Sequence, residues 1–373
     1  MAKKAYIGID GVARKIRKSY IGVDGVARKI RKAYIGIGGV ARPCWSGGEL
    51  VYYGTVTGLS RARFRLAATA IGNYALFGGG LNNDYLSDVD AYNESLTRST
   101  PLGLSQGRSE LVAASVGSYA LFGGGGYNNG ESHTSSENVD AYNESLTRTT
   151  TSLSASGDMA ATSVGNYALF GCGANKNMDA YDKYLTRLSP TGFNASLYGM
   201  AAAGGVDYAL FGGGSSIYGV NSSVVFAYDK SLTQTLPASL SVARFYLAAT
   251  GVGDYALFGG GRKESTTTNS YSTVDAYDKS LTRTQPTALS VARGNLVATT
   301  VGEYALFAGG YAKEDYAVVD AYDVNLTRTM PTALKAARAQ FAATSVGCFA
   351  LFGGGNISSG NTKLATVDAY TVI

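Results

Sequence analysis

Few of the side chains that catalysis or metal binding requires occur in this chain. Its 373 residues include one histidine, His133, and three cysteines, Cys44, Cys172 and Cys348. A single imidazole excludes every site that needs two histidine ligands, and cysteines so widely spaced match neither a disulfide framework nor a four-ligand zinc motif. We therefore expect a protein without catalytic residues, metal or cofactor.

Charged residues instead recur at regular places. Five arginines each precede an alanine-rich or valine-containing segment, and five aspartates each lie in a copy of "VDAY". The arginines are Arg63, Arg108, Arg244, Arg293 and Arg338, and the aspartates are Asp90, Asp140, Asp275, Asp320 and Asp368. The third repeat keeps Asp179 without an arginine, and the fourth lacks both. Residues repeated in this way usually belong to the framework, so we predict structural ion pairs; an anion-binding central funnel is the alternative.

A glycine-rich phrase recurs in step with these residues. The stretch "NYALFGGG" starts at residue 73, and its Tyr-Ala-Leu-Phe core, with one Phe-for-Tyr exchange, returns at Tyr119, Tyr167, Tyr208, Tyr255, Tyr304 and Phe349. A phosphate-binding loop would need a Lys-Ser or Lys-Thr pair and a following helix, and neither accompanies any copy. The copies instead predict buried strands, with glycines that permit positive φ and close backbone approach.

The spacing of these copies predicts the architecture. They are 45, 48, 41, 47, 49 and 45 residues apart, which is the period of a propeller blade made of one four-stranded sheet. Within residues 296–330, "LVATTVG", "YALFAGG", "AVVDAY" and "LTRTMP" read as the four strands, with an Asx-type turn at Asp323. We therefore predict an all-β, seven-bladed β-propeller.

The last unit lacks its fourth strand. The phrase "SLTR" and its variants occur six times, whereas one further strand, residues 49–56, precedes the first unit. We predict that this strand completes the last blade and so removes two unpaired sheet edges. Residues 49–373 would then form one closed propeller domain.

These units resemble the repeats of the Kelch family of β-propellers. The resemblance rests on the glycines after the second strand, on pairs such as Tyr277-Asp278 after the third, and on the arginine before the first. It covers all seven units, although the tryptophan usual in the fourth strand is absent. It implies Kelch-like four-stranded blades.

The two faces of such a disc differ in sequence. Turns on one face are near copies, such as "SVGNY" and "GVGDY", whereas the loops between second and third strands share neither length nor composition. Their Tyr, Ser, Asn and Gly suit adaptable recognition; the alternative is that unconstrained loops drift towards polar residues. The predicted ligand-binding face consists of Tyr85, Tyr127, Asn128, His133, Tyr218, Arg262, Lys263, Tyr271, Tyr311 and Tyr316.

Residues 1–48 form a second region, with a net charge of +9 against −4 for residues 49–373. Three 14-residue repeats each read as a β-hairpin, with turns at Asp10-Gly11, Asp24-Gly25 and Gly38-Gly39. Such hairpins have little core, which favours docking or self-association. Their basic residues favour a solvated edge over a nucleic-acid surface, because aromatic residues for base stacking are sparse.

These repeats resemble the short "YIGVGGVAR" repeats of virion and prophage proteins of Gram-positive bacteria. The resemblance implies a phage tail or surface-fibre protein on the virion surface. Since "MAKKAYIGID" contains no apolar segment of signal-peptide length, we expect the protein to be made in the bacterial cytoplasm without a signal peptide. Residues 1–48 would contact other virion proteins or copies of themselves, and the propeller would contact a host receptor, with a cell-surface glycan as candidate. The alternative is a cytoplasmic Kelch-type interaction scaffold. No apolar stretch is long enough to span a membrane.

Overall fold

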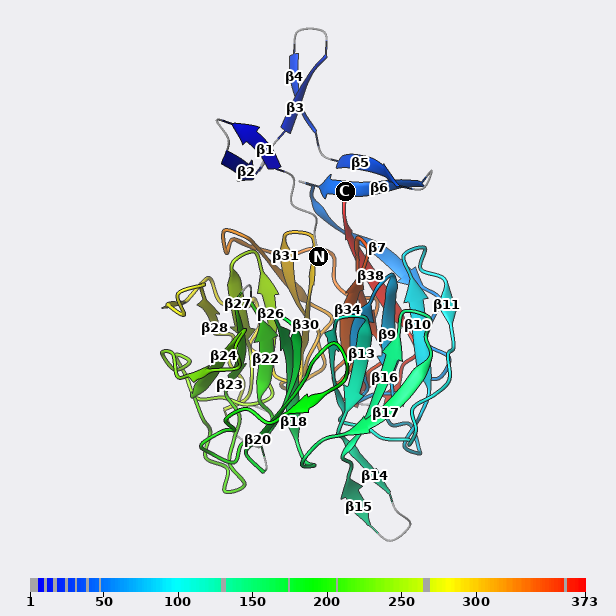
Figure 1. The fold of residues 1–373 in the computed structure, drawn as a ribbon, viewed down its shortest axis with the longest axis vertical. Coiled ribbons are helices and arrows are strands. Elements are labelled where there is room, and N and C mark those ends of the chain that lie inside the picture. Colours follow the sequence, from blue (N-terminus) through cyan, green and yellow to red (C-terminus); the bar gives the residue numbers. More distant parts are fainter. Residues whose placement is uncertain are drawn as a thin grey trace.

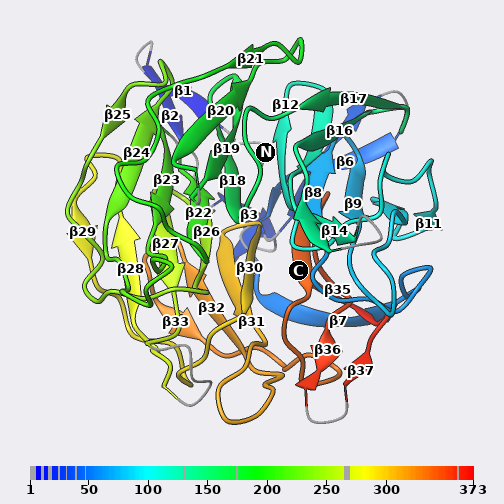
Figure 2. The same cartoon turned by 90° about the horizontal axis from the view of Figure 1, so that it is seen from below.

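The protein was studied as a computed structural model, which describes residues 48–373 except 129–131, 174, 206, 264–268 and 359–360. Within residues 6–46 it describes the backbone of six strands. Seven four-stranded antiparallel sheets, the blades, surround one axis (Figures 1 and 2). The predicted seven-bladed propeller is confirmed.

The first strand of each blade is innermost and the fourth is outermost. Blade 1 consists of β8 (Ala67–Ile71), β9 (Tyr74–Gly78), β10 (Val89–Asn93) and β11 (Arg98–Ser99). Blade 2 consists of β12 (Val112–Val116), β13 (Tyr119–Gly123), β16 (Asn138–Asn143) and β17 (Arg148–Ser152). Blade 3 consists of β18 (Met159–Val164), β19 (Tyr167–Cys172), β20 (Asn177–Tyr181) and β21 (Arg187–Leu188).

The next three blades repeat this order. Blade 4 consists of β22 (Ala201–Gly204), β23 (Tyr208–Gly212), β24 (Val225–Asp229) and β25 (Gln234–Thr235). Blade 5 consists of β26 (Ala248–Val252), β27 (Tyr255–Gly259), β28 (Val274–Tyr277) and β29 (Arg283–Thr284). Blade 6 consists of β30 (Val297–Val301), β31 (Tyr304–Ala308), β32 (Val319–Asp323) and β33 (Arg328–Thr329).

Blade 7 takes strands from both ends of the chain. It consists of β34 (Ala342–Val346), β35 (Phe349–Gly353), β38 (Val367–Val372) and β7 (Leu50–Val56). Two short hairpins extend loops between second and third strands. They are β14 (Gly126–Asn128) with β15 (His133–Ser135), and β36 (Asn356–Ile357) with β37 (Thr362–Lys363).

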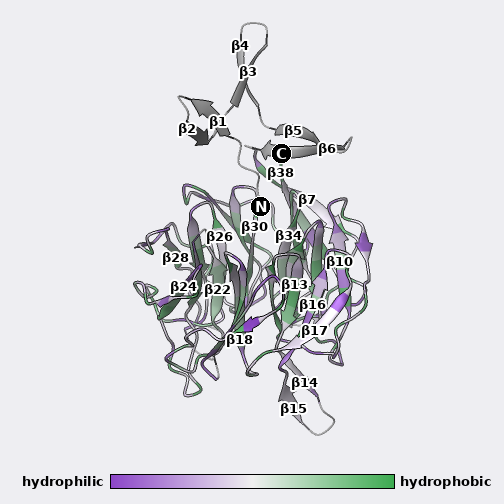
Figure 3. Ribbon diagram, viewed as in Figure 1, coloured by the Kyte–Doolittle hydropathy of each residue, from purple (hydrophilic) through white to green (hydrophobic). Residues whose placement is uncertain are grey.

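Position within the blade sets the burial of each strand. The Tyr-Ala-Leu-Phe strand is buried after its first residue, as in β13, whereas the first strand alternates buried and partly buried residues, as in β8. The second strand lies inside its sheet and between neighbouring blades, so both of its faces are apolar. Figure 3 shows hydrophobic residues concentrated in these inner strands and polar residues towards the outer strands and loops. No helix long and apolar enough to cross a membrane occurs among the described residues.

The glycines after the second strand have two structural causes. Gly123 has no room for a side chain, because a Cβ atom there would lie 2.8 Å from the ring of Phe170 in the next blade. Gly124 and Gly125 instead adopt φ angles of +68° and +85°, a region that favours glycine. Close approach and positive φ, both predicted from the sequence, are confirmed here.

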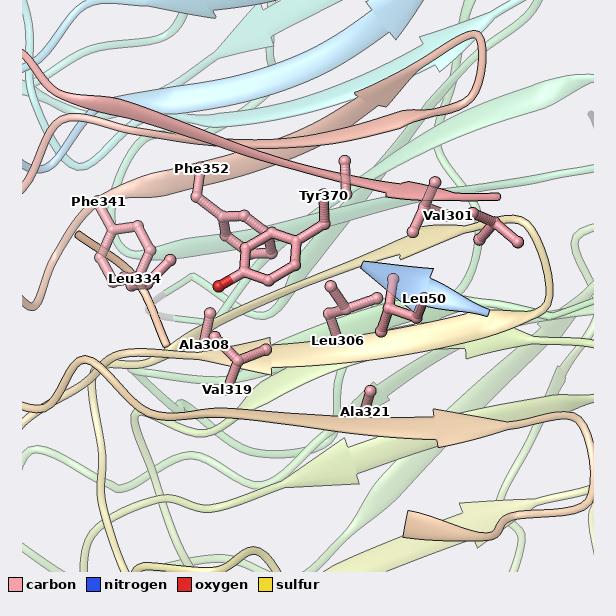
Figure 4. Close-up of a cluster of buried hydrophobic side chains, with 12 residues drawn as sticks. Leu50, Val301, Leu306, Ala308, Val319, Ala321, Leu334, Phe341, Phe352 and Tyr370 are labelled. Carbon is pink, nitrogen blue, oxygen red and sulfur yellow. The ribbon is translucent and has the colours of Figure 1, made fainter. Parts of the chain in front are cut away.

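Strand β7 closes the ring as predicted. It pairs with β38 along its whole length, and Glu49 and Ile373 exchange two further backbone hydrogen bonds of 2.8 and 3.0 Å. Figure 4 shows Leu50 beside Val301 and Leu306 of blade 6. The N-terminal strand therefore adds to the apolar core between the last two blades.

Residues 6–46 contain three antiparallel hairpins, which Figure 1 draws outside the ring. They are β1 (Tyr6–Ile9) with β2 (Val12–Lys15), β3 (Ser19–Val23) with β4 (Val26–Ile30), and β5 (Lys32–Ile37) with β6 (Val40–Ser46). Each coincides with one 14-residue repeat. The turn residues predicted from the sequence lie outside the described residues.

The chain enters the propeller on the face of the near-identical turns. The hydroxyl of Tyr304, which follows one of these turns, donates to the carbonyl oxygen of Gly48 at 3.4 Å. The loops between second and third strands lie on the opposite face, where the β14–β15 hairpin projects (Figures 1 and 2). The N-terminal repeats and the variable loops are thus attached to opposite faces of the disc.

Candidate binding face

The loops between second and third strands form a rim around the variable face (Figure 2). Tyr218 is 87 % exposed at the tip of its loop, beside the exposed Ile217 and Val220. Asn128 is exposed and pairs through its backbone with His133, whose side chain lies outside the described residues. Lys263 is exposed as well. The structure therefore places these predicted residues where a large ligand could meet them.

The other six predicted residues of this face are half-buried: Tyr85, Tyr127, Arg262, Tyr271, Tyr311 and Tyr316. Some of them lie at the base of a loop. Tyr271 and Tyr316 donate their backbone N–H groups to Gly261 and Gly310 at 2.8 and 2.9 Å. The predicted set therefore combines two groups that the structure separates, the loop tips and the loop bases.

The five repeat arginines form buried ion pairs with aspartates of their own blades. The N–O distances are 2.8, 2.6, 2.9, 2.8 and 2.7 Å for Arg63–Asp90, Arg108–Asp140, Arg244–Asp275, Arg293–Asp320 and Arg338–Asp368. All ten side chains are 0 % exposed. Burial lowers the pKa of Arg108, Arg244, Arg293 and Arg338, and the aspartates oppose that change. Because solvent does not reach them, these pairs are structural and do not line an anion-binding funnel.

Blades 3 and 4 replace this arrangement. In blade 3, Asp179 accepts two hydrogen bonds from Ser154 at 2.8 and 2.9 Å, but the nearest cation is Arg187 at 3.8 Å. In blade 4, Phe226 stands where the aspartate stands elsewhere, and its ring centroid lies 4.7 Å from that of Phe193. Leu197 occupies the position of the repeat arginine in this blade, so apolar residues replace both members of the ion pair.

Sequence reasoning missed a second variable set, which lies at the axis of the same face. In six of the seven blades, one residue of the turn before the first strand forms a backbone hydrogen bond with its counterpart in a neighbouring blade. Five backbone bonds of 2.8–3.3 Å join six of the residues in blade order, and six of the seven residues have φ between +50° and +65°. We call this set the axial ring: Arg65, Glu110, Asp158, Gly199, Tyr246, Asn295 and Gln340.

Asp158 links blades 3 and 4 in this ring through its side chain. Blade 3 has one residue fewer than blade 2 in this turn, and Oδ1 of Asp158 accepts the Gly199 N–H at 3.0 Å in place of a backbone carbonyl. Although the side chain is exposed, the surrounding protein desolvates it and raises the pKa of Asp158 to about 6. The Gly199 hydrogen bond opposes this rise, and the charge of Glu110 adds to it.

Aromatic side chains lie beside the ring in blades 5 and 6. Tyr246 is 36 % exposed, and its ring centroid lies 4.8 Å from that of Phe245. The guanidinium carbon of Arg262 lies 5.6 Å from the Tyr246 centroid and 6.0 Å from the Tyr311 centroid. Burial raises the pKa of Tyr246 and lowers that of Arg262. Arg262 and Tyr311, both predicted from the sequence, therefore belong with the axial residues rather than with the loop tips.

The signal for the axial ring was present in the repeats. Between the repeat arginine and the first strand, the five blades that have this arginine carry Phe-Arg, Ser-Glu, Phe-Tyr, Gly-Asn and Ala-Gln. The next residue is Leu in four of them and Phe in the fifth. The second of these two positions differs in every copy, inside otherwise repeated sequence, and so marks a side chain that the framework does not specify.

Comparisons with known proteins support the fold alone. No family model and no curated protein matches this chain. A solved structure described as "Structure of YjhT" is similar over 74 % of this chain and 99 % of its own length, with 12 % sequence identity and a TM-score of 0.58. At that identity the similarity shows a shared propeller fold. No group of three or more His, Cys, Asp or Glu side chains that could hold a metal ion occurs in the described part of the chain.

Proposed function

We propose that this chain is a non-enzymatic binding protein of a phage or prophage virion. Residues 1–48 dock it to other virion proteins or to copies of itself, as the resemblance of their repeats implies. The variable face of the propeller binds a ligand on the host cell surface. The protein then acts at the virion surface, as part of a tail or surface fibre.

The placement of the N-terminal repeats supports this proposal most directly. Gly48 meets the face of near-identical turns, and the loops that differ in every blade lie on the other face. A chain anchored through its N-terminal repeats would therefore hold its variable loops away from the anchor. A receptor-binding protein needs this arrangement.

The composition of the variable face favours a surface glycan as the ligand. Tyrosine offers a rigid surface that is apolar on its ring faces and polar at its hydroxyl, and Ser, Asn and Gly supply adaptable hydrogen bonds. Tyr218 is 87 % exposed on the rim, so it needs no rearrangement to reach a large ligand.

Adsorption of the labelled full-length protein to a panel of Gram-positive cells tests the proposal. We expect binding to at least one strain, and periodate oxidation of the surface glycans should reduce it. The combined change Tyr127→Ala, Tyr218→Ala and Tyr271→Ala should weaken adsorption at least tenfold. The matched control is Tyr184→Ala, because Tyr184 is 74 % exposed in a turn between third and fourth strands, on the other face.

Two results would count against the proposal. If the triple variant keeps its melting temperature and still adsorbs fully, the variable face is not the binding surface. If the wild-type protein adsorbs to no strain, the cytoplasmic Kelch-type scaffold becomes the better explanation.

A further inference from the structure

The axial ring joins a fixed backbone to side chains that differ at every position. Its seven members belong to seven residue types, yet six of them share a positive φ. Glycine adopts this conformation without strain, whereas a residue with a Cβ atom adopts it less readily. Only Gly199 takes that option. The other five positions keep side chains of five different types.

The side chains of Glu110 and Asp158 are exposed and those of Arg65, Asn295 and Gln340 are partly exposed, and together they offer several kinds of hydrogen bond. Arg65 and Glu110 form a 2.8 Å ion pair and are 37 % and 51 % exposed. Asp158 adds a second carboxylate, and Asn295 and Gln340 add amides that both donate and accept. The Asn295 side-chain oxygen has no hydrogen-bond partner among the described residues. The ring therefore retains polar groups that its own framework does not use.

From this arrangement we infer that the axial ring binds the non-anchored end of a neutral saccharide chain. The inference rests on the proposed function and adds to it a site and a chemical class. Hydroxyl groups of a sugar donate to the carboxylates of Glu110 and Asp158 and accept from the amides of Asn295 and Gln340. The ring of Tyr246 supplies a surface for the apolar face of the sugar.

The charges of the site favour a neutral ligand. Arg65 and Arg262 carry two positive charges, and Glu110 and Asp158 carry two negative ones, so the charges at the axis cancel. An anionic sugar would meet two carboxylates, and a cationic one would meet two guanidinium groups. Neutral hydroxyl groups can bond to both kinds without either repulsion.

The rim of loops favours the end of a glycan over its middle. Loops from all seven blades surround the axis, and the β14–β15 and β36–β37 hairpins project on this face (Figure 2). A polymer lying across the face would rest on the loop tips. A terminal sugar can reach the axis while the sugars behind it contact residues such as Tyr218.

Saturation-transfer NMR on the full-length protein tests the inference with defined probes. The probes are the methyl glycosides of glucose, galactose, mannose and N-acetylglucosamine, with N-acetylneuraminate and glucosamine as charged comparisons. We expect transfer to at least one neutral glycoside and a loss of at least tenfold in affinity for Asp158→Asn and for Tyr246→Ala. Asn keeps an oxygen for the Gly199 N–H, so the first variant preserves the ring. Tyr184→Ala on the far face should leave monosaccharide binding unchanged.

Each other outcome contradicts the inference. No transfer to any neutral glycoside, stronger binding of a charged sugar, or binding that survives both axial substitutions would overturn it. The cell-adsorption experiment separates this failure from failure of the proposed function. Adsorption that depends on the rim tyrosines but not on Asp158 or Tyr246 would leave the function standing and remove the axial site. Sugar binding at the axis without adsorption to any cell would leave the axial site standing and remove the proposed function.

Discussion

The charge of each repeat arginine is balanced by one buried carboxylate. Nη2 of Arg108 donates to Asp140 at 2.6 Å, and the other oxygen of Asp140 accepts the Ser105 N–H at 2.9 Å. Moving two charges out of water costs several kcal/mol per ion, which the attraction between them roughly offsets. A complete pair therefore adds little net stability. Loss of one partner leaves an uncompensated buried charge.

Blade 3 has the aspartate but no repeat arginine, so a matched pair of substitutions can measure the cost of leaving an arginine unpaired. We expect Asp140→Asn to lower the free energy of unfolding by about 3–5 kcal/mol, because Arg108 stays buried without its partner. Asp179→Asn should cost less than about 1 kcal/mol, because no buried arginine faces Asp179 and Asn can still accept from Ser154. Urea denaturation of both variants gives the two values. Equal losses would show that the carboxylate matters for its hydrogen bonds rather than for the arginine.

The raised pKa of Asp158 gives stability a pH dependence of known sign. The carboxyl group titrates near 4 in an unfolded chain and at about 6 in the folded protein. Stability from the protonated form is therefore fully present below about pH 4 and lost as pH rises through 6. Asp158→Asn, which cannot ionise, should melt increasingly above the wild type as pH rises from 4.5 to 7.5. Since the side chain is exposed, solvent screening keeps the gap small. Calorimetry that finds the same gap at both pH values would contradict this assignment.

At the residue scale, the repeats predicted the paired residues but not the axial ones. Arg63 and Asp90 recur in register, so their pairing follows from repetition alone. Asp158 follows a deletion, and its role depends on a hydrogen bond between blades 3 and 4 that no motif records. The side chains of the ring differ because their shared feature is a backbone conformation, and that conformation leaves no common residue type in the sequence.

At the scale of elements, close contact between blades explains why the repeat has so little freedom. Gly123 packs under the ring of Phe170, and the corresponding Gly78 packs under Phe122. Each blade therefore limits the size of a residue in its neighbour. Only blade 6 has Ala308 at this position among the seven copies.

We expect Gly123→Ala to destabilise the protein by about 1–3 kcal/mol. A Cβ atom 2.8 Å from the Phe170 ring forces that ring or the strand to move. Where space allows, the same exchange would stabilise by about 0.4–1 kcal/mol through the unfolded chain. The sign of the change in urea midpoint therefore decides between a packed and an open site. Ala308→Gly is the reverse control, and it should also destabilise because it removes a buried methyl group and adds unfolded-state freedom.

The strands could be predicted because each has a local cause. The Asx turn predicted at Asp323 is present in the structure, where Oδ1 accepts the N–H groups of Asn325 and Thr327 at 2.9 and 2.8 Å. The loops between second and third strands have no such constraint. The β14–β15 and β36–β37 hairpins were not predicted, since their short strands lack both apolar alternation and a repeated turn. Likewise, the sequence did not separate Tyr218 at a loop tip from Tyr271 at a loop base.

At the scale of the whole molecule, the propeller is a ring in which every blade has two neighbours. Inner strands of adjacent blades contact one another all the way round, and the axial backbone bonds follow the same path. Opening the ring at one point would expose two blade surfaces and a sheet edge. The ring is closed where β7, from the N-terminal side of the chain, pairs with β38.

Two truncations that differ by ten residues test how much this closure contributes. Removal of residues 1–47 leaves β7 intact, so the melting temperature should stay within about 2 °C of the wild-type value. Removal of residues 1–57 takes away the β38 partner, the buried Leu50 and the Tyr52 hydroxyl that donates to Asp368 at 2.6 Å. Loss of an apolar side chain and a part-buried hydrogen bond amounts to roughly 3–6 kcal/mol, which for a domain of this size corresponds to a fall of about 4–9 °C.

Point substitutions keep this prediction testable if the shorter chain fails to fold. Leu50→Ala with Tyr52→Phe in the full-length protein removes the same two contacts and leaves the strand in place. We expect that variant to melt between the two truncations, because the backbone ladder of β7 and β38 survives in it. If the variant and both truncations all have the melting temperature of the wild-type protein, the seventh blade is stable without its N-terminal strand. The ring would then be held by its inner strands and its axial hydrogen bonds alone.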